Sequence, residues 1–220
     1  DQMGLRKLSK LSNYSSIEVT PTHTGVQRFV FDDADTLYHT DPTYRGIFRA
    51  AIYPHVQYPV NCWYGYEKQK GPPNVSSMIS KNGEIWIGSK TEGVFRIYRG
   101  HIDAFNTQDS TLPKIINSLC FDNDGNIILG SNDGKVMVVH QDRQGKLQIL
   151  SRITSADGLV GNVVRWLIVD KGNYLYAGTN LGLNRIDLNL LYKSKKVRIN
   201  FLDKDQGYFD CTGKTASLDD

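Results

Sequence analysis

The residues best suited to contact a ligand lie in one aromatic segment, residues 51–74, which four prolines interrupt. Its candidate contact residues are Tyr53, His55, Trp63, Tyr64 and Tyr66. Aromatic rings can stack on the apolar faces of sugars and form hydrogen bonds with their polar atoms. Prolines hold a loop in one shape, which reduces the ordering cost of binding. Packing of the same rings between sheets is the stronger alternative.

The sequence offers no pattern for catalysis or for metal binding. Residues 122–126 resemble a calcium loop, but an EF-hand needs Gly and Glu where Ile127 and Asp133 stand. A hairpin turn is therefore the favoured interpretation. The five histidines show no close pairing of the zinc type, and no nucleophile elbow, phosphate-binding loop or dinucleotide fingerprint occurs. We expect no catalytic residue, no metal and no cofactor in this segment.

A short stretch that recurs three times organises the rest of the chain. Each copy runs from one glycine through a short apolar strand to a second glycine, and a third glycine follows. These structural positions are Gly83, Trp86, Gly88 and Gly93, then Gly125, Gly130 and Gly134, then Gly172, Gly178 and Gly182. The third copy is one residue longer than the others. The closing glycines are 42 and 48 residues apart, a period that predicts a repeat architecture.

Each repeat predicts four short strands. In the third copy we expect strands at 163–169, 174–177, 183–187 and 197–201, because these runs are β-branched, aromatic or alternating and are bounded by turn residues. Gly178 should lie where a neighbouring sheet approaches closely. Arg165 and Trp166, on the innermost strand, should either line a central channel and contact a ligand or support its wall. One such sheet cannot bury both faces, so the units must stack.

The repeats resemble the two-component regulator propeller repeat. The resemblance rests on the glycines above and on Trp86, Ser89, Arg96, Ser131, Thr179 and Arg185, with 156–159 matching an inter-blade signature. Ile128 and Tyr176 depart from it, because they replace the usual tryptophan. The resemblance implies an all-β fold, a β-propeller of four-stranded antiparallel blades that is part of a larger, seven-bladed propeller.

The repeats also predict the organisation of the chain, with residues 1–220 forming a partial β-propeller. The expected parts are the end of a preceding blade at 1–20, a degenerate blade with the aromatic loop at 22–70, blades at 75–110, 111–155 and 159–205, and the start of a further blade at 207–220. A closed ring of five blades, completed by the two half-blades, is the alternative. It would leave one strand of a hydrogen-bond ladder missing, which is costly.

The resemblance further implies a periplasmic sensor region, the ectodomain of an inner-membrane, Bacteroidetes-type hybrid histidine kinase. Such a region would bind an oligosaccharide or another small ligand and signal to the remainder of the sensor kinase chain, without catalysis of its own; a homodimer is left open. The net charge of +3 on 220 residues gives no support for nucleic-acid binding. The alternatives are a propeller-type glycan lyase or hydrolase, and a protein-interaction scaffold.

Overall fold

The computed structural model describes residues 28–31, 36–41, 46–51, 61–64, 72, 74–99, 101–107 and 110–202. The chain divides into two compact units, one made of residues 1–87 and 95–103 and the other of 88–94 and 104–220. Tyr53, His55, Tyr66 and the expected half-blades at 1–20 and 207–220 lie outside the described residues. No helix in the described ranges is long and apolar enough to cross a membrane.

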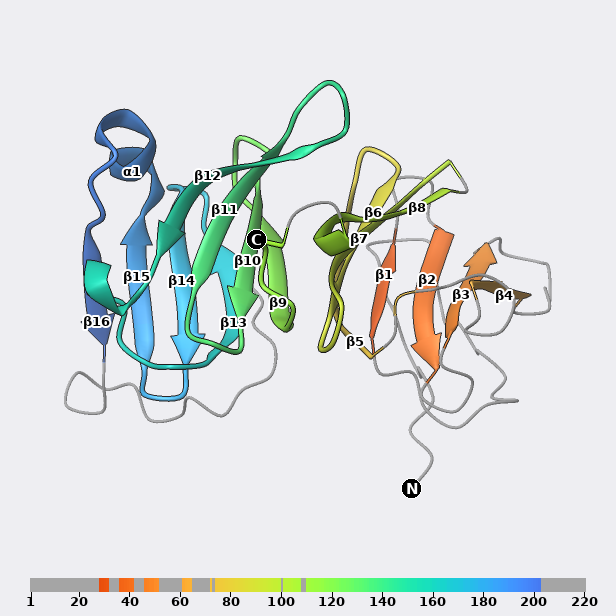
Figure 1. Cartoon of the computed structure of the whole chain (residues 1–220), viewed down its shortest axis with the longest axis horizontal. Coiled ribbons are helices and arrows are strands. Elements are labelled where there is room, and N and C mark those ends of the chain that lie inside the picture. Colours follow the sequence, from red (N-terminus) through yellow and green to blue (C-terminus); the bar gives the residue numbers. More distant parts are fainter. Residues whose placement is uncertain are drawn as a thin grey trace, which may run out of the picture. The chain divides into compact units, whose positions relative to one another are not determined.

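Among the described residues, four antiparallel sheets account for nearly all the regular structure, and within each the strands are neighbours in chain order (Figure 1). The first sheet contains β1 (Phe29–Phe31), β2 (Thr36–Asp41), β3 (Gly46–Ala51) and β4 (Asn61–Tyr64). The second contains β5 (Val75–Lys81), β6 (Glu84–Ser89), β7 (Gly93–Tyr98) and β8 (His101–Ala104). A 3-10 turn, Phe105–Thr107, follows β8.

The third and fourth sheets repeat this order. The third contains β9 (Ile116–Phe121), β10 (Ile127–Ser131), β11 (Val136–Gln141) and β12 (Leu147–Ile153). After a 3-10 turn at Ser155–Asp157, the fourth contains β13 (Val164–Val169), β14 (Tyr174–Thr179), β15 (Leu183–Asp187) and β16 (Ile199–Leu202). The all-β fold with four-stranded antiparallel sheets is therefore confirmed.

The third and fourth sheets pack face to face around one apolar core, and their first strands, β9 and β13, lie side by side. Alternate residues point into this core on two strands; on β11 they are Val136 and Val138, and on β14 Leu175 and Ala177. Backbone and side-chain hydrogen bonds fix the two inner strands. Asn117 donates to the Val164 carbonyl at 2.9 Å, and Leu167 N–H donates to the Ser118 hydroxyl at 3.1 Å.

The first hairpin turn of each of these sheets is closed by an aspartate. Asp122 accepts the N–H of Asn126 at 2.7 Å, and Asp170 accepts the N–H of Tyr174 at 2.9 Å. The hairpin interpretation of residues 122–126 is thus confirmed. Three residues after each aspartate the backbone takes a left-handed φ, +86° at Gly125 and +60° at Asn173. The structural equivalent of Gly125 is therefore Asn173, not Gly172, which explains why the third copy is one residue longer.

The hydroxyl residue that follows each closing glycine fixes the second hairpin turn. Ser131 accepts the N–H of Lys135 at 3.0 Å, and Thr179 accepts the N–H groups of Leu181 and Gly182 at 3.2 and 3.3 Å. Ser131 and Thr179 are both fully buried. The Gly-Ser/Thr pair of the repeat thus ends one strand and holds the turn to the next.

The closing glycines occupy equivalent, penultimate positions of the second strands, but different groups approach them. A β-carbon on Gly130 would lie 2.7 Å from Val164 Cγ1 of the neighbouring sheet, as expected for stacked sheets. A β-carbon on Gly178 would instead meet the indole of Trp166, which belongs to the same sheet. The approach of a neighbouring sheet to Gly178 stays a prediction, because the expected next blade at 207–220 lies outside the described residues.

A seven-residue helix, α1 (Leu188–Ser194), separates β15 from β16 and delays the last strand by two residues relative to our expectation. Asp187 caps its first turn by accepting the N–H of Leu190 at 2.9 Å. Leu188 and Leu191 are buried and extend the core between the two sheets. Figure 1 shows α1 beyond the end of β15.

Candidate functional site

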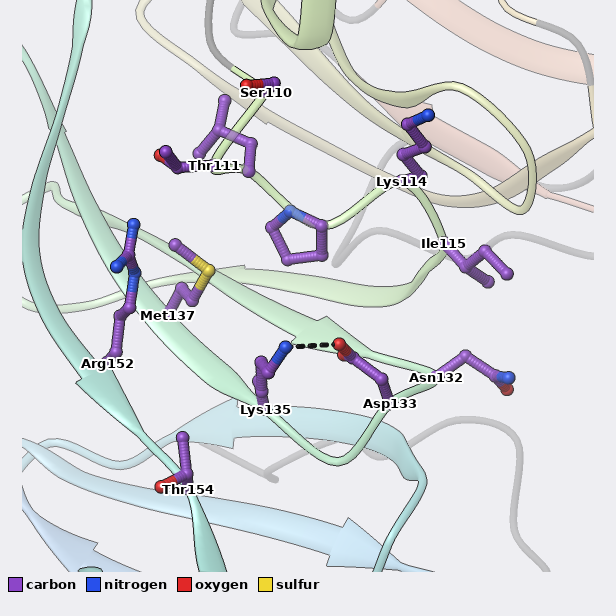
Figure 2. A pocket seen from close by; sticks show the side chains of 12 residues that line it. Ser110, Thr111, Lys114, Ile115, Asn132, Asp133, Lys135, Met137, Arg152 and Thr154 are labelled. Atoms are coloured by element: carbon purple, nitrogen blue, oxygen red, sulfur yellow. Dashed lines mark hydrogen bonds and ion pairs between the residues drawn. The ribbon is translucent and has the colours of Figure 1, made fainter. Parts of the chain in front are cut away.

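A pocket of about 590 Å³ opens at one end of the third sheet (Figure 2). We call it the loop-end pocket. Its lining residues are Ser110, Thr111, Leu112, Pro113, Lys114, Ile115, Asn132, Asp133, Lys135, Met137, Arg152 and Thr154. They come from the segment before β9, the β10–β11 turn, the start of β11 and the end of β12. In an antiparallel sheet of this order these four places meet at one end. The volume lies within the ~300–1,000 Å³ range typical of ligand sites.

The floor of the loop-end pocket is apolar and buried. Leu112 and Met137 are 2% and 1% exposed. Met137 alternates with Val136 and Val138, so it points away from the core between the third and fourth sheets. Arg152 is the cross-strand partner of Met137, and the two side chains therefore stand next to each other on the same face of the sheet.

The rim of the pocket carries three cationic side chains and one carboxylate. Lys135 and Asp133 form an ion pair at 2.6 Å, marked by the dashed line in Figure 2. The Ser131 hydroxyl also donates to Asp133. Burial alone would raise the pKa of Asp133, but the hydrogen bonds from Lys135 and Ser131 outweigh it and lower that pKa. Asp133 is therefore ionised and engaged at neutral pH.

Unlike Lys135, the cationic residues Lys114 and Arg152 are not paired with a described carboxylate. Both side chains are exposed, and Figure 2 shows them on different sides of the pocket, from the segment before β9 and from β12. Within the described part of the chain, neither makes a hydrogen bond or an ion pair. The pocket can therefore offer two charged donors to a ligand, together with hydroxyl and amide groups above an apolar floor.

Metal binding receives no support from the described residues, since nowhere in them do three or more His, Cys, Asp or Glu side chains gather. Cys120 packs against the core, and its burial, with Asp122 nearby, raises the pKa of its thiol. A protonated, buried thiol is a poor nucleophile and a poor metal ligand.

Of the residues predicted as ligand contacts from the sequence, Arg165 and Trp166 are not among the described residues that line this pocket. Trp63 and Tyr64 lie on β4, in the other unit. Arg165 and Trp166 lie on β13, where the register of the β13–β14 pair shifts. Arg165 is half-buried, whereas Trp166 is 9% exposed and packs on Gly178. Their roles as ligand contacts therefore stay predictions.

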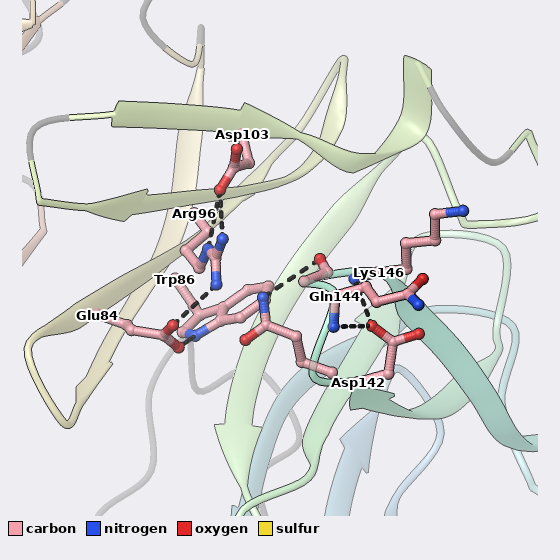
Figure 3. Close-up of polar contacts among 9 residues, drawn as sticks. Glu84, Trp86, Arg96, Asp103, Asp142, Gln144 and Lys146 are labelled. Atoms are coloured by element: carbon pink, nitrogen blue, oxygen red, sulfur yellow. Dashed lines mark hydrogen bonds and ion pairs between the residues drawn. The ribbon is translucent and has the colours of Figure 1, made fainter.

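Arg96, the arginine of the repeat motif, binds two carboxylates within the second sheet (Figure 3). Arg96 donates to Glu84 at 2.8 Å and to Asp103 at 2.6 and 2.9 Å. Trp86, which is 1% exposed, donates its indole N–H to Glu84 at 3.0 Å. The arginine and tryptophan of the motif are thus tied to one carboxylate, and their geometry holds strands together.

Figure 3 also shows the turn between β11 and β12, the second turn of the third sheet that an aspartate closes. Asp142 accepts the N–H groups of Gln144 and Lys146 at 2.9 and 3.0 Å. Because β11 ends and β12 begins here, this turn lies at the opposite end of the third sheet from the loop-end pocket.

Comparisons with known proteins identify the architecture. No protein-family model matches the sequence, and no curated protein matches it significantly. Two solved extracellular domains of B. thetaiotaomicron proteins, described as hybrid two-component systems, superpose with TM-scores of 0.61 and 0.60 at 16% and 19% identity. They cover 83% and 84% of this chain, which spans 22% and 24% of theirs.

Virginiamycin B lyase of Staphylococcus aureus is also similar, with a TM-score of 0.56 at 13% identity. It covers 81% of this chain, and the chain covers 55% of the lyase. These likenesses agree with the four-stranded sheets, their chain order and the adjacent inner strands β9 and β13. The chain therefore has a β-propeller fold.

Proposed function

We propose that this chain is part of a periplasmic sensor region of a two-component signalling system and that it recognises an oligosaccharide. The observation that carries the proposal is the likeness of more than four-fifths of the chain to two extracellular domains described as parts of hybrid two-component systems. The repeat pattern of Gly88, Gly130 and Gly178, each followed by Ser or Thr, supports the same assignment.

In this proposal the four described sheets belong to a larger propeller, and the remainder of the sensor kinase chain is the partner that receives the signal. Kinase activity belongs to the full-length protein, whereas this segment binds and does not catalyse. The loop-end pocket is our candidate binding site among the described residues, because it joins ligand-sized volume to unengaged charged donors.

Calorimetric titration of the chain with an oligosaccharide panel tests binding. Autophosphorylation of the full-length protein, measured with and without the best ligand, tests signalling. We expect saturable binding and a ligand-dependent change in the phosphorylation rate. Absence of binding across the panel, with a folded protein by circular dichroism, would contradict the oligosaccharide assignment.

The aromatic segment needs its own test, because its rings contact either a ligand or a neighbouring sheet. Trp63→Ala should weaken affinity by about 1–3 kcal/mol and leave stability nearly unchanged if Trp63 is on a binding surface. It should cost about 3–5 kcal/mol of stability if the ring is packed. Titration and thermal melting of the same variant separate the two cases.

A propeller-type enzyme is the second candidate, and the likeness to virginiamycin B lyase favours it. Incubation of the chain with the same oligosaccharides, followed by mass spectrometry of the products, distinguishes the two. Cleavage products that increase with time and protein concentration would support the enzyme, whereas intact recovered ligand supports binding alone.

A further inference from the structure

We propose that the loop-end pocket binds an acidic saccharide, and that Lys114 and Arg152 contact its carboxylate or sulfate group. The inference rests on the proposed function, because it specifies the class of oligosaccharide and the residues that select it. It is independent of the aromatic segment at residues 51–74.

The rim of the loop-end pocket carries more positive than negative charge. Three cations and one carboxylate line the pocket. The carboxylate, Asp133, is already paired with Lys135 at 2.6 Å and accepts from Ser131. Lys114 and Arg152 form no ion pair with another described residue, so no described carboxylate balances their charges. Cationic groups gathered at one site attract anions and disfavour cations.

The chemistry of the lining favours a charged ligand over a neutral one. None of the twelve described lining residues is aromatic, so the described part of the pocket offers no ring on which an uncharged sugar could stack. The floor is apolar and is formed by Leu112, Pro113 and Met137. Polar atoms come from the side chains of Ser110, Asn132 and Thr154. A polyhydroxylated ligand with an anionic group uses each of these features.

The two cationic residues have complementary properties. The planar guanidinium of Arg152 can donate two parallel hydrogen bonds to a carboxylate or sulfate. Its position is set by the buried, cross-strand Met137, which is 1% exposed. Lys114 reaches the pocket on a flexible stem from the segment before β9 and adds a point charge. Both side chains are exposed, so their charge carries little desolvation cost before binding.

The test uses calorimetric titration of the whole 220-residue chain with four probes. Trigalacturonate carries carboxylates, 6-O-sulfo-N-acetyllactosamine carries a sulfate ester, galactotriose is neutral, and sodium sulfate supplies an anion without a sugar. We expect one acidic saccharide to bind at least tenfold more tightly than galactotriose. The carboxylated and sulfated probes distinguish the two sources of the anionic group.

Single variants identify the site. Lys114→Gln and Arg152→Gln should each weaken binding of the acidic saccharide about five- to tenfold, the scale of one charge-assisted hydrogen bond at an exposed site. Arg143→Gln is the matched control, because it removes an exposed arginine from the β11–β12 turn at the opposite end of the sheet. It should leave the affinity unchanged.

Each outcome decides the proposal. Acidic binding that depends on Lys114 and Arg152 but not on Arg143 supports it. Equal affinity for galactotriose and the acidic probes, with all three variants unaffected, overturns it while leaving oligosaccharide sensing in place. Binding of sodium sulfate alone overturns the saccharide and with it the proposed function, but retains an anion site. No binding of any probe overturns the inference, and the wider oligosaccharide panel then decides the proposed function.

Discussion

The indole of Trp166 lies against the backbone of Gly178, its cross-strand partner in the β13–β14 pair. A β-carbon on Gly178 would lie 2.0 Å from Cε2 of the indole, far inside contact distance. Trp166 is 9% exposed, so its ring has little freedom to move aside. Position 178 is therefore glycine because the indole of Trp166 leaves no room for a β-carbon. The backbone at Gly178 does not adopt a left-handed conformation.

Gly178→Ala should lower the free energy of unfolding by about 1–3 kcal/mol, the cost of overpacking a closely packed site. Urea denaturation followed by tryptophan fluorescence and circular dichroism measures it. The control is the same change in a Trp166→Ala background, where the β-carbon meets no ring and the cost should largely disappear. An equal cost in both backgrounds would contradict the role of the indole.

Ser131→Ala should destabilise the protein by about 1–3 kcal/mol, because it removes the buried hydroxyl that accepts the N–H of Lys135. Ser155→Ala is the matched control, since Ser155 is exposed and its side chain holds no turn. Chemical denaturation of both variants gives the comparison. Similar, small effects of the two changes would argue against Ser131 as the residue that fixes the hairpin.

Tyr192→Phe should cost about 1–3 kcal/mol of stability. The Tyr192 hydroxyl donates to the Asp122 carboxylate, linking α1 to the third sheet across 70 residues. Burial and this hydrogen bond raise the pKa of Tyr192, so the hydroxyl remains a donor throughout the physiological range.

Asp122 is 3% exposed and would keep only its contacts with Asn126 after this change. Tyr174→Phe is the control, because the Tyr174 hydroxyl makes no hydrogen bond to a described residue. Thermal melting of both variants should show a clear loss for Tyr192→Phe alone. A melting temperature equal to that of wild type would rule out a stabilising link.

Acid should weaken the turn between β10 and β11. The folded state lowers the pKa of Asp133, so this carboxylate stabilises the fold fully above its ordinary pKa of about 3.9. That contribution disappears as pH falls through the lower, folded-state pKa. The stability difference between wild type and Asp133→Asn should therefore be constant near neutrality and shrink below about pH 4.

Carbon-13 NMR of the Asp133 carboxyl group measures this pKa directly. Lys135→Met should move it upward, because that change removes the ion pair at 2.6 Å. A wild-type carboxyl that titrates at or above its ordinary value would contradict the assignment.

The sequence predicts the strands well because their determinants are local. Residues 183–187 form the third strand of the last sheet, as their alternation indicates. The helix α1 was not predicted, although Asp187 before Leu188, Leu190 and Leu191 is a capping signal in front of apolar residues at helical spacing. The sequence pattern assigns the turn position of the third repeat to Gly172, but in the structure Asn173 adopts the left-handed backbone conformation.

The loop-end pocket could not be predicted in this way. Lys114, Lys135 and Arg152 belong to three separate segments of the chain, and no spacing in the sequence relates them. They meet because the β10–β11 turn, the end of β12 and the segment before β9 share one end of a sheet. The aromatic segment, by contrast, can be recognised in the sequence because its rings lie within one short stretch of the chain.

The chain order of the strands has a consequence for synthesis and assembly. Every described sheet pairs each strand with the next one along the chain, so the loops that must close are short. Low contact order of this kind favours rapid formation of each sheet during translation. Links such as Asn117 to Val164, 47 residues apart, must wait until the following sheet has been synthesised. A ribosome-stalled chain ending near residue 155 should thus expose the apolar face of β11, a surface that chaperones would recognise until β13 and β14 emerge.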